Sequence, residues 1–293
     1  MRDDLPSVTA IYVAMARALA SKNQELSKAC KDPGAEALLP WFLQPLVDVA
    51  SGPVASDALR SLSFGMQDHL ALRTALIDSA VSYGVEHHDG GDHADRLQLV
   101  VLGAGLDSRA HRLDALAKVR VFEVDHPATQ KLKQRKAKAL PLSARELRYV
   151  PCDFQRTKLD GALLQAGFDT QAPALWIWEG VTMYLPEAAV RDSVARIAQL
   201  SAKHSLLITT YLTPDVVTGG GLLGRWAARG LGLISEPLRF TTTPDSLARL
   251  LGAQGFEILS DAAPVEAAPH YEIKVKRPST LMPKERICVS QKR

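Results

Sequence analysis

The chain has 293 residues, 46% of them hydrophobic and 23% charged, with a formal net charge of +3. This composition predicts a soluble globular protein with a large core, and the charge is too small to predict nucleic-acid binding. Cys30, Cys152 and Cys288 lie far apart, which argues against a structural zinc site and a disulfide framework and fits a reducing cytoplasm. The polar start and the lack of a long apolar run predict neither a leader nor a membrane span.

The first ninety residues are predicted to be helical. Residues 9–20 and 68–84 each carry apolar side chains on one helical face, and Gly84 is a candidate stop for the second helix. Between these two helices, prolines divide the chain into short segments. They are Pro33, Pro40, Pro45 and Pro53.

After residue 96 the pattern becomes that of an α/β fold. Short apolar runs alternate with helix-like segments, which predicts a doubly wound, mostly parallel sheet. The runs are 97–102, 119–124, 147–150, 174–178 and 206–211, and the last two, 256–260 and 286–290, predict an antiparallel hairpin. We therefore expect a single domain over 1–293, with a helical cap in 1–92, a sheet core in 93–293 and an insertion around 213–240.

A glycine-containing turn follows the first predicted strand, in the stretch LVVLGAGLDSRAHRL. Gly103 and Gly105 allow the backbone to bend sharply and approach a ligand. A dinucleotide fingerprint requires a third glycine where this chain has Ser108, and the carboxylate of Asp107 would repel a pyrophosphate. Asp125, at the end of the next predicted strand, can accept hydrogen bonds from a ribose. The pattern favours S-adenosylmethionine over a nicotinamide cofactor, and a plain tight turn with a surface acid is the alternative.

Three further charged residues extend this candidate site. Asp153 and Glu179 directly follow predicted strands, so Asp153 can accept from an adenine amine and Glu179 can bind an α-amino group. Arg73 adjoins the apolar face of its helix and can hold a carboxylate in a bidentate fork. Each also has a structural interpretation, respectively a helix N-cap, a surface acid and a solvated helix charge.

Taken together, these stretches resemble one family. VVLGAGLDSRAHRL, FEVDHP, CDF, EGVTMYLP and LRTALID, with the earlier TAIYVAMARALA and DPGA, resemble the leucine carboxyl methyltransferase family. The bacterial branch that includes polyketide carboxyl methyltransferases is the most similar, and the match covers most of the chain. The resemblance implies a class I methyltransferase fold of seven strands with the last one antiparallel, an N-terminal helical cap and S-adenosyl-L-methionine as cofactor.

The resemblance also implies roles for single positions. Arg73 would bind the methionine carboxylate of the cofactor, Glu179 its amino group and Asp125 its ribose. The other implied positions are Gly103, Ala104 and Gly105 along the methionine moiety, Asp153 with the backbone of Phe154 at the adenine, and Tyr184 near the acceptor.

The sequence departs from the family pattern at three positions. His111 stands where an aromatic residue is frequent, Gly34 where a tyrosine is common, and Phe154 where leucine is more usual. Because the first two positions are expected on the acceptor side, the acceptor itself is not carried over from the family.

We expect methyl transfer to oxygen, with a small hydrophobic carboxylic acid, polyketide-like or acyl, as acceptor. A carboxylate is already ionised at neutral pH and needs no general base. A phenolic hydroxyl would need one, for which His111 is a candidate, although a structural histidine at a helix start is an alternative. The apolar insertion around 213–240, with Trp226, is either a wall of the acceptor site or a packed helix.

Other function classes find less support. No tyrosine is followed four positions later by lysine, as in short-chain dehydrogenases, and GGGLLGRW lacks the lysine of a phosphate loop. The basic segment 131–138 is expected to be a solvated helix face, with an anion or nucleic-acid contact as alternative. A non-catalytic scaffold stays open, and the sequence predicts no oligomeric state. The residues of the glycine-rich loop HHDGGDH that could ligate a metal, where no metal is expected, are His87, His88, Asp89, Asp92 and His93.

Overall fold

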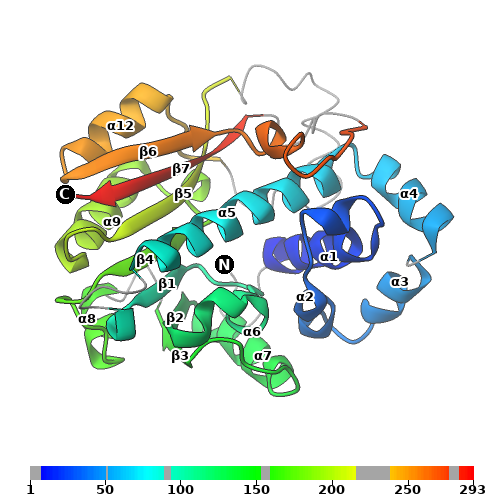
Figure 1. Cartoon of the computed structure of the whole chain (residues 1–293), viewed down its shortest axis with the longest axis horizontal. Helices are drawn as coiled ribbons and strands as arrows, with labels where there is room; N and C mark the ends of the chain where they lie inside the picture. The colour runs from blue at the N-terminus through cyan, green and yellow to red at the C-terminus, as the bar shows by residue number, and fades with distance from the viewer. Residues whose placement is uncertain (1–7, 51, 89–93, 153–158, 216–237, 277–283) are drawn as a thin grey trace.

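The structure is a computed structural model that describes residues 8–50, 52–88, 94–152, 159–215, 238–276 and 284–293 (Figure 1). Seven strands form one sheet in the order β3-β2-β1-β4-β5-β7-β6. Strand β7 is antiparallel to its neighbours β5 and β6, and the other four pairs are parallel, which confirms the expected doubly wound sheet. The strands are β1 (Gln98–Leu102), β2 (Arg120–Asp125), β3 (Glu146–Pro151), β4 (Ala174–Trp178), β5 (Leu206–Leu212), β6 (Phe256–Ala262) and β7 (Glu285–Lys292).

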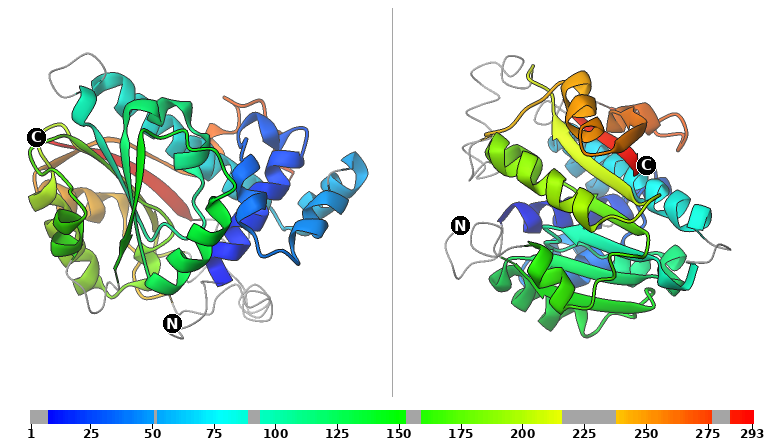
Figure 2. Two further views of the ribbon diagram at one scale, coloured as in Figure 1. Left: turned by 90° about the horizontal axis from the view of Figure 1, so that it is seen from below. Right: turned by 90° about the vertical axis from the view of Figure 1, so that its left-hand side faces the viewer.

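Helices cover both faces of the sheet, so the central strands are apolar on both sides. Val100 and Trp176 pack on one face against α8 (Leu159–Gln165), α9 (Glu187–Leu200) and α12 (Pro244–Gly252). Leu99 and Leu175 face the other side, where α5 (Met66–His88) runs diagonally across the strands (Figures 1 and 2). Every residue of β1, β4 and β5 is buried, which explains their continuous apolar runs.

Helix α5 does not stop at Gly84, and the prediction that this glycine ends the helix is wrong. The helix continues to His88, and Gly84 serves close packing instead. A Cβ atom at position 84 would lie 2.7 Å from Cδ2 of Leu175 and 3.0 Å from Cδ1 of Leu206. The glycine therefore lets the helix approach the sheet, a role that the local sequence does not reveal.

We expect Gly84→Ala to lower the free energy of unfolding by about 1–3 kcal/mol, because the new methyl group overpacks against β4 and β5. In an open helix the same change is stabilising, by about 0.5–1 kcal/mol. Gly161→Ala in α8, where a Cβ meets no atom within 4 Å, is the matched control. Urea denaturation of both variants measures the difference, and equal stabilisation by both would contradict the packing role.

The N-terminal segment forms the expected helical cap. It contains α1 (Val8–Lys22), η1 (Leu26–Lys28), α2 (Pro33–Leu38), α3 (Gln44–Val49) and α4 (Pro53–Leu62). Prolines occupy the first turns of α2, α3 and α4, where a missing backbone N–H costs nothing. Ala14 and Leu38 of the cap pack with Leu106 after β1 and with Ala137 of α7 (Pro127–Ala137), which places the cap over the glycine turn.

The predictions for two connecting segments are not fully confirmed. Lys133 of the basic segment is buried beside Glu123 rather than solvated, so the prediction of a solvated face is wrong for this residue. The short helix η5 (Pro264–Ala267) lies between β6 and β7. Most of the 213–240 insertion, Trp226 included, lies outside the described residues. Within the described part of the chain, no helix has the length and hydropathy to cross a membrane. The remaining short helices are η2 (Ala94–Arg96), α6 (Arg109–Arg112), η3 (Asp114–Lys118) and η4 (Thr182–Tyr184).

Candidate functional site

The glycine turn after β1 requires both of its glycines. Gly103 and Gly105 take φ angles of 68° and 51°, in the left-handed region that side chains disfavour. A Cβ at position 103 would lie 2.6 Å from Cγ2 of Val181, and one at 105 would lie 3.0 Å from Cβ of Ala10 in α1. Close packing by the cap and by the segment after β4 therefore adds to the backbone requirement.

The backbone N–H groups of this turn are committed to protein acceptors. Gly103 and Ala104 donate to the Val124 carbonyl at 2.8 and 3.1 Å, and Gly105 donates to Oδ2 of Asp125 at 2.5 Å. In phosphate-binding turns such N–H groups face the anion. These bonds agree with the interpretation that the turn does not hold a pyrophosphate.

Asp125 lies at the end of β2, beside the glycine turn. Its Oδ1 accepts from the N–H of His126 at 2.6 Å, so each carboxylate oxygen has one backbone donor. Burial raises the pKa of Asp125 despite these two hydrogen bonds, which act in the opposite direction. A carboxylate has about four lone-pair sites, so two remain for a ligand.

Glu179 and Arg73 meet at the tip of β4. Nε of Arg73, on α5, lies 2.9 Å from Oε1 of Glu179, and both side chains are largely buried. Neither side chain is therefore a solvated surface charge, which was the alternative interpretation of both residues. Burial alone would raise the pKa of Glu179, but Arg109 and Arg73 outweigh it and lower that pKa.

Arg73 has a second carboxylate partner that the sequence analysis missed. Nη1 of Arg73 lies 3.2 Å from both oxygens of Glu285, the first residue of β7, and His69 Nε2 lies 2.5 Å from Glu285 Oε2. His69 and Arg73 are four residues apart on α5 and so share one face. Burial opposes ionisation of Glu285, but Arg73 and His69 prevail and lower its pKa to about 2.

Arg109, the first residue of α6, joins this pair to a larger network. Its buried guanidinium contacts Asp107 at 2.5 Å, Asp78 of α5 at 2.7 Å and Glu179 at 2.8 Å. Asp107 is thus neutralised by Arg109 rather than aimed at a phosphate position. Arg112, one turn further along α6, also pairs with Asp78. One feature of the sequence could have indicated this network, namely the charged residues at 107, 109 and 112 directly after the glycine turn.

We call the connected side chains the charged cluster. Asp32, at the start of α2, connects the cap to it, because Ser108 donates to this carboxylate at 2.6 Å and Arg17 of α1 lies 3.5 Å away. The cluster holds five carboxylates against four guanidinium groups. Its members are Asp32, Asp78, Asp107, Glu179, Glu285, Arg17, Arg73, Arg109 and Arg112, with His69 at its margin.

The two candidate catalytic residues are His111 and Tyr184. Nδ1 of His111 is 2.9 Å from the Pro141 carbonyl, and burial lowers the pKa of the imidazole. Tyr184 is half-buried at the end of η4. Asp153 and Phe154 lie outside the described residues, as do positions 89–93 of the glycine-rich loop. Among the residues that are described, no three His, Cys, Asp or Glu side chains gather as metal ligands would.

The departure at Gly34 has a packing explanation. A Cβ there would lie 3.1 Å from Cβ of Ser108, the residue before α6. A larger side chain would push the start of α2 away from the glycine turn and strain the contact between Ser108 and Asp32. Gly34 therefore lies against the site from the cap side.

Comparison with known proteins gives matches over most of the chain. The model of the leucine carboxyl methyltransferase family matches residues 10–198. A "Putative S-adenosyl-L-methionine-dependent methyltransferase" of Mycolicibacterium smegmatis is 33% identical and covers 85% of this chain and 83% of its own. One from Mycobacterium sp. strain JLS, with the same name, is 32% identical over 90% of this chain and 86% of its own.

Two solved structures share the fold. A "putative methyltransferase" from Thermobifida fusca covers all of this chain and 96% of its own, with a TM-score of 0.58 and 17% identity. A DUF574 family protein of Streptomyces avermitilis covers 85% of this chain and 91% of its own, with a TM-score of 0.52 and 16% identity. The sequence matches show that the chain belongs to the leucine carboxyl methyltransferase family of S-adenosyl-L-methionine-dependent methyltransferases.

Proposed function

We propose that the amino-acid moiety of S-adenosylmethionine inserts between Arg73 and Glu179. This moiety carries a carboxylate and an ammonium group, which need a guanidinium and a carboxylate at short range, and the 2.9 Å pair supplies both. The bound cofactor carries one net positive charge, which a cluster with more carboxylates than guanidinium groups would favour. Asp125 would accept from the ribose hydroxyls, and Gly103, Ala104 and Gly105 would line the methionine moiety. The cofactor supplies an electrophilic methyl group on its sulfonium.

We further propose that the methyl acceptor is the carboxylate oxygen of a small hydrophobic acid, polyketide-like or acyl. One observation carries this proposal: each carboxylate of the charged cluster is paired with an arginine. The pKa of Asp107, Glu179 and Glu285 is lowered as a result, which makes them poor proton acceptors. An acceptor that arrives ionised needs no base, and the chain then contributes alignment and exclusion of water. The name of the family supports the same acceptor class.

A hydroxyl acceptor is the second candidate, and a specific contact favours it. Glu285 fixes Nε2 of His69, which lies on α5 one turn before Arg73. When Nε2 donates to Glu285, Nδ1 is left with a lone pair that can accept a proton from a phenol. His111 offers the same arrangement, because its Nδ1 donates to the Pro141 carbonyl and leaves Nε2 with a lone pair.

The pH dependence of methyl transfer separates the two acceptors. A carboxylic acid with a pKa of about 4 is ionised throughout the range from pH 6 to 9, so its methylation rate is expected to stay level there. A phenol with a pKa of about 10 would be methylated faster as pH rises. Matched pairs of aromatic and long-chain acids and phenols would be incubated with radiolabelled cofactor.

The chemistry of the product gives an independent readout. A methyl ester releases its label as methanol in mild base, whereas a methyl ether keeps it. We expect base-labile product and a level pH profile. Base-stable product with a rate that rises with pH would replace the carboxylate proposal with the hydroxyl one.

A further inference from the structure

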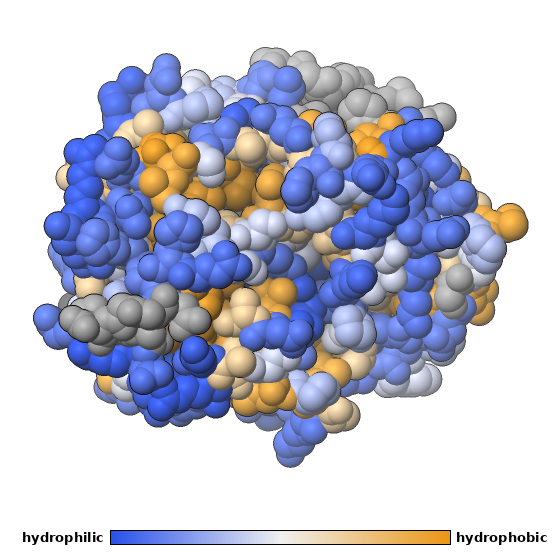
Figure 3. All heavy atoms as spheres, viewed as in Figure 1, coloured by the Kyte–Doolittle hydropathy of each residue, from blue (hydrophilic) through white to orange (hydrophobic). Residues whose placement is uncertain are grey.

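Helices α3 and α4, with their flanking turns, concentrate exposed apolar side chains. Of the fifteen large hydrophobic side chains that are exposed in the described part of the chain, eight lie between positions 41 and 64. Figures 1 and 2 show both helices projecting from one side of the molecule, and Figure 3 shows apolar residues at its margin over α4. We call these eight the α3–α4 surface: Trp41, Phe42, Leu46, Val49, Val54, Leu59, Leu62 and Phe64.

Helix α4 turns polar side chains inward and apolar ones outward. Ser56 and Arg60, one helical turn apart, are buried, whereas Val54 and Leu62 are 84% and 68% exposed. Surface helices normally show the opposite arrangement. Apolar side chains directed outward in this way indicate a partner.

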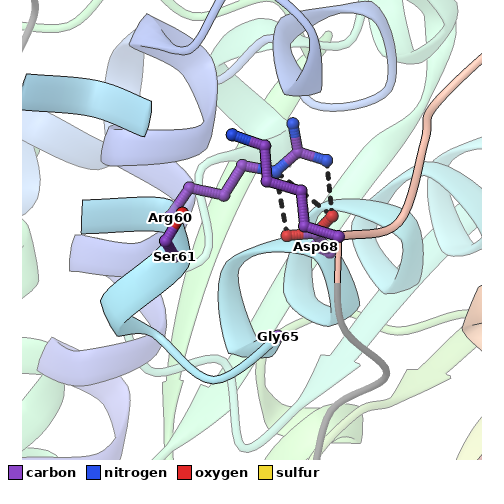
Figure 4. Close-up of a pocket in the computed structure, with 5 residues that line it drawn as sticks. Arg60, Ser61, Gly65 and Asp68 are labelled. Atoms are coloured by element: carbon purple, nitrogen blue, oxygen red, sulfur yellow. Dashed lines mark hydrogen bonds and ion pairs between the residues drawn. The ribbon is translucent and has the colours of Figure 1, made fainter. Parts of the chain in front are cut away.

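Buried polar contacts fix this orientation of α4. Arg60 Nη2 lies 2.5 Å from Asp68 Oδ1, Arg60 Nη1 lies 2.5 Å from Glu25 Oε2, and Ser56 accepts from Asn23 at 2.8 Å. Figure 4 shows the fork of Arg60 directed at Asp68. Rotating α4 to bury its apolar side would break a buried ion pair, so the exposed face is built into the fold.

The turn after α4 adds a second, independent observation. Phe64 takes a φ angle of 51° and is half-exposed. Glycine or asparagine adopts this conformation with less strain than a bulky residue. The chain thus holds an aromatic side chain in solvent at a position where its backbone disfavours one, which fits a contact made by the ring.

The size and charge of the surface favour a second copy of this chain. From typical side-chain areas and the exposed fractions of 36 to 84%, the eight side chains present about 900 Å². A stable interface buries about 800 Å² per partner, so the summed area of the eight side chains is of the size that a stable dimer needs. The one basic residue between 41 and 64, Arg60, is buried, and Lys276, which lies beside α4, is paired with Asp57, so the basic rim that favours anionic membranes is weak here.

We propose that two copies of this chain associate through their α3–α4 surfaces about a two-fold axis. In such an isologous interface the α3–α4 surface of one copy contacts the same surface of the other copy. Association would cover Leu62 and also Trp41, an aromatic side chain of the kind that dominates interface energetics.

Sedimentation velocity across a micromolar concentration series tests the proposal. The wild-type chain is expected to sediment as a dimer of the 31.8 kDa chain, and Leu62→Glu as a monomer. Leu164→Glu is the matched control, because Leu164 is 51% exposed on α8, away from the α3–α4 surface, and it is expected to stay dimeric. Trp41→Ser, outside any helix, repeats the disruption if Leu62→Glu fails to fold by circular dichroism.

Three results would overturn the proposal. A wild-type chain that stays monomeric throughout the series would do so. Loss of the dimer in Leu164→Glu to the same extent as in Leu62→Glu would assign it to another surface. A monomer that co-sediments with phosphatidylcholine and phosphatidylglycerol vesicles would make the α3–α4 surface a membrane contact.

Discussion

Replacing Arg109 by methionine is expected to lower the free energy of unfolding by about 3–5 kcal/mol at neutral pH. The guanidinium is fully buried and contacts Asp78, Asp107 and Glu179. Methionine fills most of the volume but leaves these carboxylates without their shared cation, and an uncompensated buried charge is costly. Arg191→Met removes an exposed pair on α9 with Glu187 and serves as the control, with a change of at most about 0.5 kcal/mol.

The loss in Arg109→Met depends on pH in a defined direction. In the wild type, burial raises the pKa of Asp107 and Glu179, but Arg109 outweighs it, so both are lowered. These groups therefore add stability above their unfolded pKa values of about 4, and that stability fades as pH falls further. Without Arg109 both values rise, so the gap between variant and wild type is expected to be largest at neutral pH and to shrink below about pH 4.

Urea denaturation at several pH values measures this gap. Arg109→Lys, which keeps the charge but not the fork, should give an intermediate loss. An Arg109→Met curve that coincides with that of Arg191→Met at neutral pH would show that the charged cluster does not stabilise the fold.

The sheet was predictable because burial on two faces leaves a strong local signal. Runs such as ALWIW contain no polar position, and the structure shows why, since helices cover both sides of β4. The end of α5 was not predictable in this way. Gly84 has the residue type of a helix stop, but its role depends on Leu175 and Leu206, which are distant in sequence.

The candidate site, too, could be predicted from the sequence only in part. Asp125 and Glu179 could be placed from sequence because the carboxyl ends of parallel strands lie at one edge of the sheet. Their partners could not. Arg73 and Glu285 are separated by 212 positions and meet only because β7 runs antiparallel beside β5. The pairing of Asp107 with Arg109 could not be predicted either, because Arg109 is near in sequence but turns toward Asp107 only in the folded chain.

Asp125→Asn is expected to weaken binding of S-adenosylmethionine by about 100-fold. The amide oxygen can still accept from the N–H of Gly105, so the glycine turn keeps its anchor. An asparagine amide has one acceptor oxygen where a carboxylate has two, and it lacks the charge. Two charge-assisted hydrogen bonds to ribose hydroxyls would be weakened, at about 1.5 kcal/mol each. Asp192→Asn, an exposed residue of α9, is the matched control.

Isothermal titration calorimetry of S-adenosylmethionine into the wild type, Asp125→Asn and Asp192→Asn therefore tests the site most directly. We expect micromolar binding by the wild type and by Asp192→Asn, and a loss of about two orders of magnitude in Asp125→Asn. Equal affinity in all three proteins would place the cofactor elsewhere. Binding of NADH in place of S-adenosylmethionine by the wild type would contradict the assignment of the glycine turn to a methyl donor.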